Sequence, residues 1–235
     1  MLVEGLDGRV AVVTGAQRGI GLAIAESLKR CGARVAALDV QPPVADGLFG
    51  VVCDVRDEAS VNDAFSQIEE QLGSPSVLVM NAGVYPVVPF EETSLAVWNN
   101  TIAINLTGAF LCARRVLPAM RAAGYGRLVA IGSSAGKAGG AKSVAAYAAS
   151  KGGIMTLAKS IANEYASHGI TSNALAPALI DTDMIAGTKD LLAKIPVGRF
   201  GTVDEVAALV TFLCSGHAGY ITGEVVDING GFLID

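Results

Sequence analysis

The sequence predicts an α/β fold in which a parallel sheet is wound in both directions and carries helices on both faces. Short runs rich in valine alternate with longer segments that have the apolar spacing of helices. The apolar runs are nearly continuous rather than alternating, which is typical of strands buried on both faces. Alternation of strand and helix indicates a parallel sheet with helical crossover connections.

The length and composition of the chain favour one large domain. The chain has 235 residues, and folds of this class often reach that length undivided. Hydrophobic residues make up 51% and charged residues 17%, which supplies a core and argues against disorder. We find no repeat, linker or low-complexity segment, so residues 1–235 are predicted to form a single domain.

Seven strands and five helices are predicted in chain order. The strands span 9–13, 34–38, 48–53, 76–80, 127–131, 170–175 and 224–228. The helical patterns cover 19–31, 57–72, 95–122, 145–167 and 202–214. In such sheets, ligands bind beyond the carboxyl ends of the strands, near the point where the winding reverses. The residues that follow the strands are therefore the candidates for chemistry.

Charge and hydropathy argue against several classes of protein. The net charge of −5 gives no electrostatic basis for binding nucleic acid or an anionic membrane. The mean hydropathy is +0.49, but no uninterrupted apolar run approaches the length of a membrane span. The start, MLVEGLDGR, is acidic where a secretory signal needs a basic region. We expect a cytoplasmic protein without nucleic-acid or membrane partners.

The cysteines and histidines do not predict a metal site. Cys31, Cys53, Cys112 and Cys214 are widely separated and form no CxxC pair. The two histidines share no metal-ligand spacing with a carboxylate or a cysteine. We expect four free, mostly buried thiols and no bound metal.

A glycine-rich turn follows the first predicted strand. In TGAQRGIG, Gly15, Gly19 and Gly21 stand where a helix begins. Glycine permits a tight turn and a close approach of the backbone to a phosphate. The spacing differs from the standard G-x-G-x-x-G, so the position after the first strand carries the assignment. We predict a Rossmann-like dinucleotide-binding turn; a nucleotide kinase is disfavoured because the Lys-Ser/Thr of a P-loop is missing.

Asp39 follows the second predicted strand, 18 residues beyond Gly21. An acidic residue there accepts hydrogen bonds from the ribose hydroxyls of a dinucleotide. It also repels the 2′-phosphate of NADP(H), since unit charges about 4 Å apart cost about 4 kcal/mol at an effective dielectric constant of 20. Arg18 acts in the opposite direction as a candidate phosphate partner. The balance favours NAD(H), with NADP(H) as the alternative.

Tyr147 and Lys151 lie four positions apart in AAYAASKGG, residues 145–153. On a helix, positions i and i+4 share one face, with Cβ atoms about 5–6 Å apart. Two such side chains can share a ligand or shift each other's ionisation, but the same spacing also occurs by chance. The spacing alone therefore leaves both interpretations open.

Taken in order, TGAQRGIG, NAG (81–83) and YAASK (147–151) resemble the motifs of the classical short-chain dehydrogenases/reductases, over essentially the whole chain. The resemblance implies a nicotinamide-dependent oxidoreductase acting on ketones and secondary alcohols. It implies a catalytic set of Asn105, Ser134, Tyr147 and Lys151. It implies cofactor contacts from Gly15, Gln17, Arg18, Gly19, Ile20, Gly21, Asp39, Asp54, Val55, Asn81, Ala82, Gly83, Tyr147, Lys151, Pro177, Ile180 and Thr182. Ser133 competes with Ser134, but its spacing from Tyr147 is one residue off.

The resemblance makes Tyr147 the general acid or base, supported by Lys151. Ionising a free tyrosine at pH 7 costs about 4 kcal/mol, and an ammonium group about 5 Å away returns roughly 3 kcal/mol at an effective dielectric constant of 20. Lys151 would also hold the nicotinamide ribose. Ser134 would hydrogen-bond the substrate oxygen, and Asn105 would hold a water that links Lys151 to solvent.

PALIDTDM, residues 177–184, resembles the segment that clasps the nicotinamide amide. The family usually has Pro-Gly where this sequence has Pro177-Ala178. Alanine resists the positive φ that glycine allows, so the family's backbone at this point is not carried over.

The later sequence is most like the 3-oxoacyl-[acyl-carrier-protein] reductases, which typically use NADPH and dock an acidic carrier on basic residues. Arg127 matches one of these residues, but His168 stands where the second arginine would be. We expect an NAD-linked enzyme of small ketones or secondary alcohols, with an NADPH-dependent reductase of acyl thioesters as the alternative. A non-catalytic NAD-binding sensor or scaffold is the alternative from another class, and the complete catalytic set counts against it.

Helices 95–122 and 145–167 carry apolar or small residues over much of their circumference. A helix that covers a sheet has one buried face, so apolar residues on a second face need another partner. In the family these helices form one contact between subunits, and the C-terminal segment forms another. Phe232, Leu233 and Ile234 suit such a contact, although the tail has the alternative of folding back on its own subunit. Two distinct twofold contacts predict a homotetramer.

Overall fold

The computed structural model describes residues 4–41, 45–182 and 189–234, and its centre is one seven-stranded parallel sheet. The strands are β1 (Val10–Thr14), β2 (Arg34–Asp39), β3 (Phe49–Val52), β4 (Val77–Met80), β5 (Gly126–Ile131), β6 (Ile170–Pro177) and β7 (Val225–Ile228). Their order is β3-β2-β1-β4-β5-β6-β7. The winding reverses between β1 and β4, so the ends of these strands flank the expected ligand crevice.

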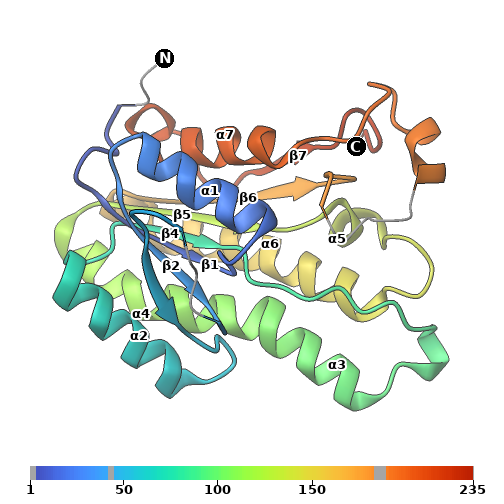
Figure 1. Ribbon diagram of the computed structural model, residues 1–235, viewed down its shortest axis with the longest axis horizontal. Helices are drawn as coiled ribbons and strands as arrows, with labels where there is room; N and C mark the ends of the chain where they lie inside the picture. The colour runs from blue at the N-terminus through green and yellow to red at the C-terminus, as the bar shows by residue number, and fades with distance from the viewer. Residues whose placement is uncertain (1–3, 42–44, 183–188, 235) are drawn as a thin grey trace.

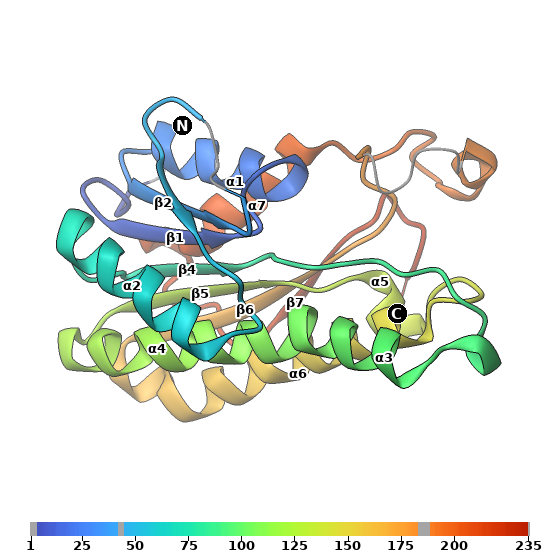
Figure 2. The ribbon, with the colours of Figure 1, turned by 60° about the horizontal axis from the view of Figure 1, so that its bottom comes forward.

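Helices cover both faces of the sheet, as Figure 1 and Figure 2 show. On one face lie α1 (Gly19–Arg30) and α7 (Val203–Cys214), which pack against each other. On the other face lie α2 (Glu58–Leu72), α4 (Gly108–Ala123) and α6 (Ala145–Tyr165). Each layer of helices closes its own apolar cluster against the sheet. The predicted doubly wound α/β fold is confirmed.

Burial explains why the strands were visible in the sequence. The strands β1, β4, β5 and β6 are buried along their whole length, so nearly every position is apolar or small. The edge strands β3 and β7 are only partly buried.

Several short elements had no signal in the sequence pattern. They are α5 (Ser134–Ala138) and the 3-10 helices Phe90–Glu92, Ala166–His168, Lys189–Lys194 and Gly216–Ala218. The element α5 follows β5 directly and begins at the N-cap residue Ser133, whose hydroxyl accepts a hydrogen bond from the Ala135 N–H group at 3.1 Å.

The predicted helix 95–122 is a continuous stretch of three elements: α3 (Leu95–Ile102), a π-helical turn (Ala103–Thr107) and α4. Within residues 95–123 the helical stretch is long enough to cross a membrane and includes an apolar window with a mean hydropathy of 1.2, although polar residues interrupt its apolar run. The inward side of α4 packs on β4, β5 and α2. Only 33% of the apolar window is buried within the chain, so much of this stretch lacks an intramolecular partner.

Candidate active site

The residues predicted for chemistry lie at one edge of the sheet. Gly15 follows β1, Asp39 ends β2, Asn81 follows β4, Ser133 follows β5 and Pro177 ends β6. These five strands are neighbours in the sheet, so their carboxyl ends form a continuous edge. Strand order alone therefore brings together groups far apart in the sequence.

Two glycines of the turn are required by close backbone approaches. Gly15 has a φ of +66°, and a Cβ atom built there would lie 2.8 Å from the Cα atom of Ala82. At Gly21 a Cβ atom would lie 2.1 Å from the carbonyl oxygen of Gly15. No side chain is accommodated at either distance. A Cβ atom at Gly19 would instead meet only the methyl group of Thr182, at 4.0 Å, so the outer side of the turn is open.

Asn81 fastens this turn to the end of β4. Its Nδ2 atom donates to the carbonyl oxygens of Thr14 and Gly15, both at 2.9 Å. The Thr14 hydroxyl in turn accepts from the N–H groups of Asn81 and Ala82 at 3.0 and 3.1 Å. The NAG motif thus holds the glycine turn in place.

The start of α1 fits a phosphate group. Arg18 occupies its N-cap without a side-chain cap hydrogen bond, and the first turn carries no acidic residue. By contrast, α2, α3, α5 and α7 begin with a capping side chain: Asp57, Ser94, Ser133 and Thr202. The first N–H groups of a helix carry partial positive charge, so an anion is favoured at an uncapped end. The residues present therefore fit the pyrophosphate of a dinucleotide.

Asp39 lies beside this turn with its carboxylate held by the backbone. Its Oδ2 atom accepts from the Gln17 N–H group at 3.1 Å, and its Oδ1 atom accepts from the Val40 N–H group at 2.8 Å. The neighbouring Arg18 is exposed. A fixed carboxylate at the end of β2 fits the position expected for contact with a ribose.

Asp54 has a different environment from the one expected. Its carboxylate pairs with Arg56 at 2.6 Å, and this hydrogen bond lowers its pKa. Val55 is buried against α4, where a Cβ atom at Gly108 would lie 2.7 Å from it. The predicted adenine contact of Asp54 stays a prediction, because Arg56 occupies the carboxylate.

Tyr147 and Lys151 lie in the first two turns of α6, and both are buried. The Nζ atom of Lys151 is 5.9 Å from the centroid of the Tyr147 ring and donates to the Ile131 carbonyl at 2.6 Å. Burial lowers the pKa of Lys151 to about 8. A Cβ atom at Gly83 would lie 3.4 Å from the same Nζ atom, so the NAG turn adjoins this pair.

The ionisation of Tyr147 differs from the expectation. Burial raises its pKa, a hydrogen bond with Ser133 partly offsets this, and Tyr85 raises the pKa further. Lys151 does not offset the cost of ionising Tyr147 here, because its ammonium group is directed at the Ile131 carbonyl. The phenol is therefore held in its protonated form.

The two candidate serines differ in their backbone positions, and the catalytic role of Ser134 stays a prediction. The side chain of Ser133 lowers the pKa of Tyr147, so Ser133 lies close to the phenol. Ser133 is extended, with a φ of −169°, at the end of the strand segment, whereas Ser134 already belongs to α5. A count of residues back from Tyr147 cannot resolve this change of backbone direction.

Asn105 lies in the π-helical turn and joins two segments of the site. Its Oδ1 atom accepts from the Val84 N–H group at 2.8 Å, and its Nδ2 atom donates to the Val84 carbonyl at 3.0 Å. The same Nδ2 atom donates to Ser150, whose hydroxyl donates to the carbonyl of Tyr147 at 2.7 Å. Asn105 thus positions residue 84 and the start of α6, and its water-holding role stays a prediction.

The segment after β6 tolerates alanine where the family has glycine. The Ala178 N–H group donates to the Ile228 carbonyl at 3.1 Å, and the positive φ of this segment falls on Leu179, at +53°. Ile180 is buried, and Thr182 lies near Gly19. Residues 183 and 184 of the predicted clasp lie outside the described residues.

Arg127 lies at the amino end of β5, away from the catalytic edge. Its buried guanidinium donates to the carbonyls of Ser215, Gly126 and Gly169 at 3.3, 2.8 and 3.2 Å. It also stacks on Tyr125 at 4.3 Å. Arg127 matches a docking residue in sequence, but its charge is already bonded to three backbone carbonyls away from the catalytic edge.

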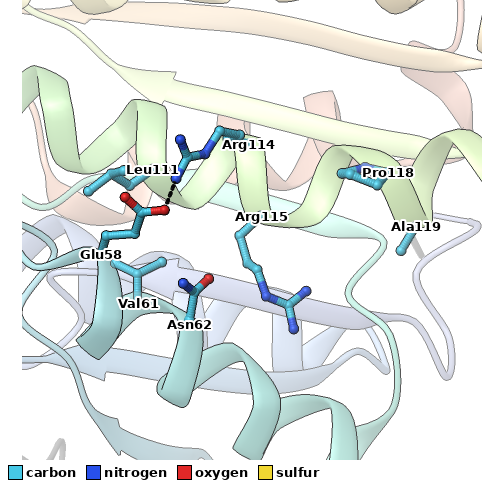
Figure 3. Close-up of a pocket in the computed structure, with 8 residues that line it drawn as sticks. All are labelled: Glu58, Val61, Asn62, Leu111, Arg114, Arg115, Pro118 and Ala119. Carbon is cyan, nitrogen blue, oxygen red and sulfur yellow. Dashed lines mark hydrogen bonds and ion pairs between the residues drawn. The ribbon is translucent and has the colours of Figure 1, made fainter.

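A pocket of about 340 Å³ lies between α2 and α4, outside the catalytic edge (Figure 3). Glu58 and Arg114 form an ion pair across it, and Arg115 pairs with Glu69 at 2.6 Å. Pro118 leaves the carbonyl of Arg114 without its helical N–H partner. The pocket contains none of the predicted site residues, and its charges are balanced, so we do not assign it to the reaction.

The thiols take no part in the site. All four cysteines are free, and burial raises the pKa of Cys53 to about 11 and that of Cys214 to about 12. Within the described ranges, no group of three or more His, Cys, Asp or Glu side chains is placed to hold a metal ion.

Comparison with known proteins places this site in a family. A family model described as "Enoyl-(Acyl carrier protein) reductase" matches residues 15–233. The chain is 41% identical to the 3-oxoacyl-[acyl-carrier-protein] reductase MabA of Mycobacterium bovis, covering 95% of this chain and 92% of that protein. It is 38% identical to the corresponding reductase FabG of Escherichia coli, covering 96% and 97%. A solved gluconate 5-dehydrogenase from Burkholderia cenocepacia, in complex with NADP and tartrate, superposes with a TM-score of 0.90 at 31% identity, covering 96% and 95%.

Proposed function

Since the chain belongs to the short-chain dehydrogenase/reductase family, we propose that it is a nicotinamide-dependent oxidoreductase that reduces a ketone to a secondary alcohol. The observation that carries this proposal is that Tyr147 and Lys151 are buried side by side, 5.9 Å from Nζ to ring centroid, at the same sheet edge as the uncapped glycine turn, with Ser133 near enough to lower the pKa of Tyr147. A non-catalytic dinucleotide-binding protein would not need this arrangement. We further propose that residues 1–235 form one cofactor-binding and catalytic domain.

A nicotinamide cofactor held at this edge would supply the hydride. Tyr147, protonated because it is buried, donates its hydroxyl proton to the carbonyl oxygen as negative charge develops there. Ser133 hydrogen-bonds the same oxygen and orients the phenol. Lys151 carries its charge below about pH 8, and its hydrogen bond to the Ile131 carbonyl holds it beside the Tyr147 ring.

The reduced bond is a carbonyl rather than a carbon–carbon double bond. The family model's description names an enoyl reductase, whereas the MabA and FabG relatives are 3-oxoacyl reductases. Two hydroxyl groups that converge at one point suit an oxygen that gains negative charge. We therefore propose reduction of a carbonyl group, as the names of the MabA and FabG relatives indicate for those proteins.

We propose NAD(H) as the preferred cofactor because the Asp39 carboxylate is fixed beside the glycine turn. The solved gluconate 5-dehydrogenase holds NADP, so this preference departs from that relative. Asp39→Ala should raise the ratio of kcat/KM for NADPH to that for NADH by about tenfold or more, since part of a repulsion of about 4 kcal/mol is removed. Asp63→Ala, on the exposed side of α2, removes the same charge and should leave the ratio unchanged. A wild type that already prefers NADPH would contradict this assignment.

The relatives make a 3-oxoacyl thioester the second candidate substrate. Their names indicate a substrate on a carrier protein, but Arg127 is buried and already bonded to three carbonyl groups. We propose a small ketone or 3-oxoacyl substrate that needs no carrier docking. A cytoplasmic location stays a prediction.

Substitution at Tyr147 tests the catalytic proposal. We expect Tyr147→Phe to bind NADH as the wild type does, but to lose about 100-fold or more in kcat with acetoacetyl coenzyme A or simple ketones, because only the proton donor is removed. Tyr220→Phe, at a fully exposed tyrosine, is the matched control. Near-normal turnover by Tyr147→Phe would refute the proposed role. If the wild type reduces a 3-oxoacyl thioester only when it is bound to the carrier protein, and reduces no free ketone, the second candidate substrate is favoured.

A further inference from the structure

We propose that Tyr85 is the specificity-determining wall of the reaction site: it separates Tyr147 from an adjoining pocket and so limits the size of the substituent on the substrate's carbonyl carbon. This inference rests on the proposed function, because it assumes that the substrate oxygen approaches Tyr147. Tyr85 lies outside every motif that predicted the site.

The first observation is a direct contact between the two tyrosines. The ring centroids of Tyr85 and Tyr147 are 4.7 Å apart, and the rings are perpendicular. Tyr85 also raises the pKa of Tyr147 through an electrostatic interaction. A carbonyl compound bound to Tyr147 and Ser133 therefore meets Tyr85 on one side.

The second observation is the pocket behind this wall. A pocket of about 330 Å³ lies between the segment after β4 and α3, and it is lined by Val84, Tyr85, Pro86, Val97, Asn100 and Thr101. Tyr85 lines this pocket and also contacts the Tyr147 ring. Removing its ring is expected to join the pocket to the reaction site.

The wall is fixed at both of its ends. Asn105 makes two hydrogen bonds to the backbone of Val84, as described above. Four residues further on, the Val88 N–H group donates to the carbonyl of Ser143 at 2.7 Å. Pro86 restricts the backbone between these two anchors. These anchors hold the segment in place, so we infer that the ring itself sets the size limit.

The lining of the pocket indicates what an enlarged site would accept. Val84, Pro86 and Val97 offer apolar surface. The side-chain oxygen of Asn100 is engaged by Arg56 at 2.9 Å. An apolar or aryl substituent fits this chemistry, because it needs no polar partner. The wild type should accept ketones that present a small group, such as methyl, on this side.

The test compares two 3-oxo esters that differ in that group. Ethyl acetoacetate presents a methyl group and ethyl benzoylacetate a phenyl group. Tyr85→Ala should raise the ratio of kcat/KM for the phenyl substrate to that for the methyl substrate by at least about tenfold, which is within the range set by steric fit. Tyr85→Phe keeps the ring, and Val97→Ala enlarges the pocket without breaching the wall. Both controls should keep the wild-type ratio to within about twofold.

Several outcomes would overturn the proposal. If folded Tyr85→Ala keeps the wild-type ratio of kcat/KM for the two esters, the Tyr85 ring does not limit substrate size. If Val97→Ala raises this ratio as much as Tyr85→Ala does, the gain comes from a general loosening of the pocket and not from loss of the wall. Tyr85→Leu serves as the second truncation if the alanine variant fails to fold. If neither the wild type nor any variant reduces either ester, although each binds NADH normally, the proposed function fails. The wall is then tested separately by calorimetry of ethyl benzoylacetate on the NADH-loaded proteins, where equal Kd values for the wild type and Tyr85→Ala would refute it.

Discussion

Burial favours the neutral form of both Tyr147 and Lys151. Loss of water raises the pKa of the phenol and lowers that of the ammonium group. The phenol is therefore a proton donor at neutral pH, whereas Lys151 titrates close to the physiological range. This combination suits ketone reduction, in which the proton moves from Tyr147 to the substrate.

The lowered pKa of Lys151 predicts a stability effect with a defined sign. The pKa is about 8 in the folded protein and 10.5 unfolded, so the unfolded chain binds more protons between these pH values, and the free energy of unfolding rises with pH there. Below pH 8 the buried charge lowers stability by about 3 kcal/mol, since one pKa unit is about 1.4 kcal/mol. Lys151→Met should be more stable than the wild type at pH 7, and the difference should shrink as pH rises from 8 to 10.5.

Urea denaturation at equal protein concentration measures this difference. The matched control is Lys159→Met, the same substitution at an exposed position of α6, which should show no pH-dependent difference from the wild type. A constant difference between Lys151→Met and the wild type from pH 7 to 10.5 would mean that Lys151 does not titrate in that window.

At the scale of elements, the sequence predicted the positions of the strands. Each of the seven strands appears within two residues of its predicted bounds. For the central strands β1 and β4 the reason is burial on both faces, which leaves an apolar run without gaps. The carboxyl ends of these strands then place the glycine turn, Asp39 and the NAG motif at one edge. The general location of the site follows from strand order.

Contacts between distant segments could not be predicted in this way. The short helix α5 places Ser133 at its N-cap and Ser134 in its first turn, and it has too few residues to show a periodic pattern. The π-helical turn gives Asn105 its partner Val84, yet the surrounding sequence has an ordinary helical pattern. Tyr85 has no signal at all, since its role depends on a ring contact with a residue 62 positions away.

Arg127 shows that a sequence match alone does not establish a role. Its position in the sequence matches that of a docking residue, but its guanidinium donates hydrogen bonds to three backbone carbonyls at the amino end of β5. A match to a motif cannot reveal which end of the sheet a residue faces until the strand's bounds are known.

At the scale of the whole molecule, the distribution of exposed apolar side chains requires an explanation. Leu95 and Phe110, on the long helical stretch, are 77% and 43% exposed, and Ile234 near the C-terminus is 88% exposed. Asn105, in the middle of the stretch, joins the site, and α4 packs on the sheet, so a membrane-spanning role does not fit this fold. A second copy of the chain is the partner that we propose for both surfaces.

Two separate twofold contacts on one subunit generate a tetramer with dihedral symmetry. We therefore expect light scattering at micromolar concentration to give four times the chain mass of 23.9 kDa. Phe110→Lys adds a cation beside Arg114, whose guanidinium lies 5.3 Å from the Phe110 ring, and buries it at the proposed α4 contact. We expect this variant to dissociate to dimers and to lose activity, because α6 with Tyr147 and Lys151 would no longer be braced. Val52→Lys makes the same substitution on the exposed edge strand β3 and should remain a tetramer. A fully active wild-type monomer would rule out the assembly.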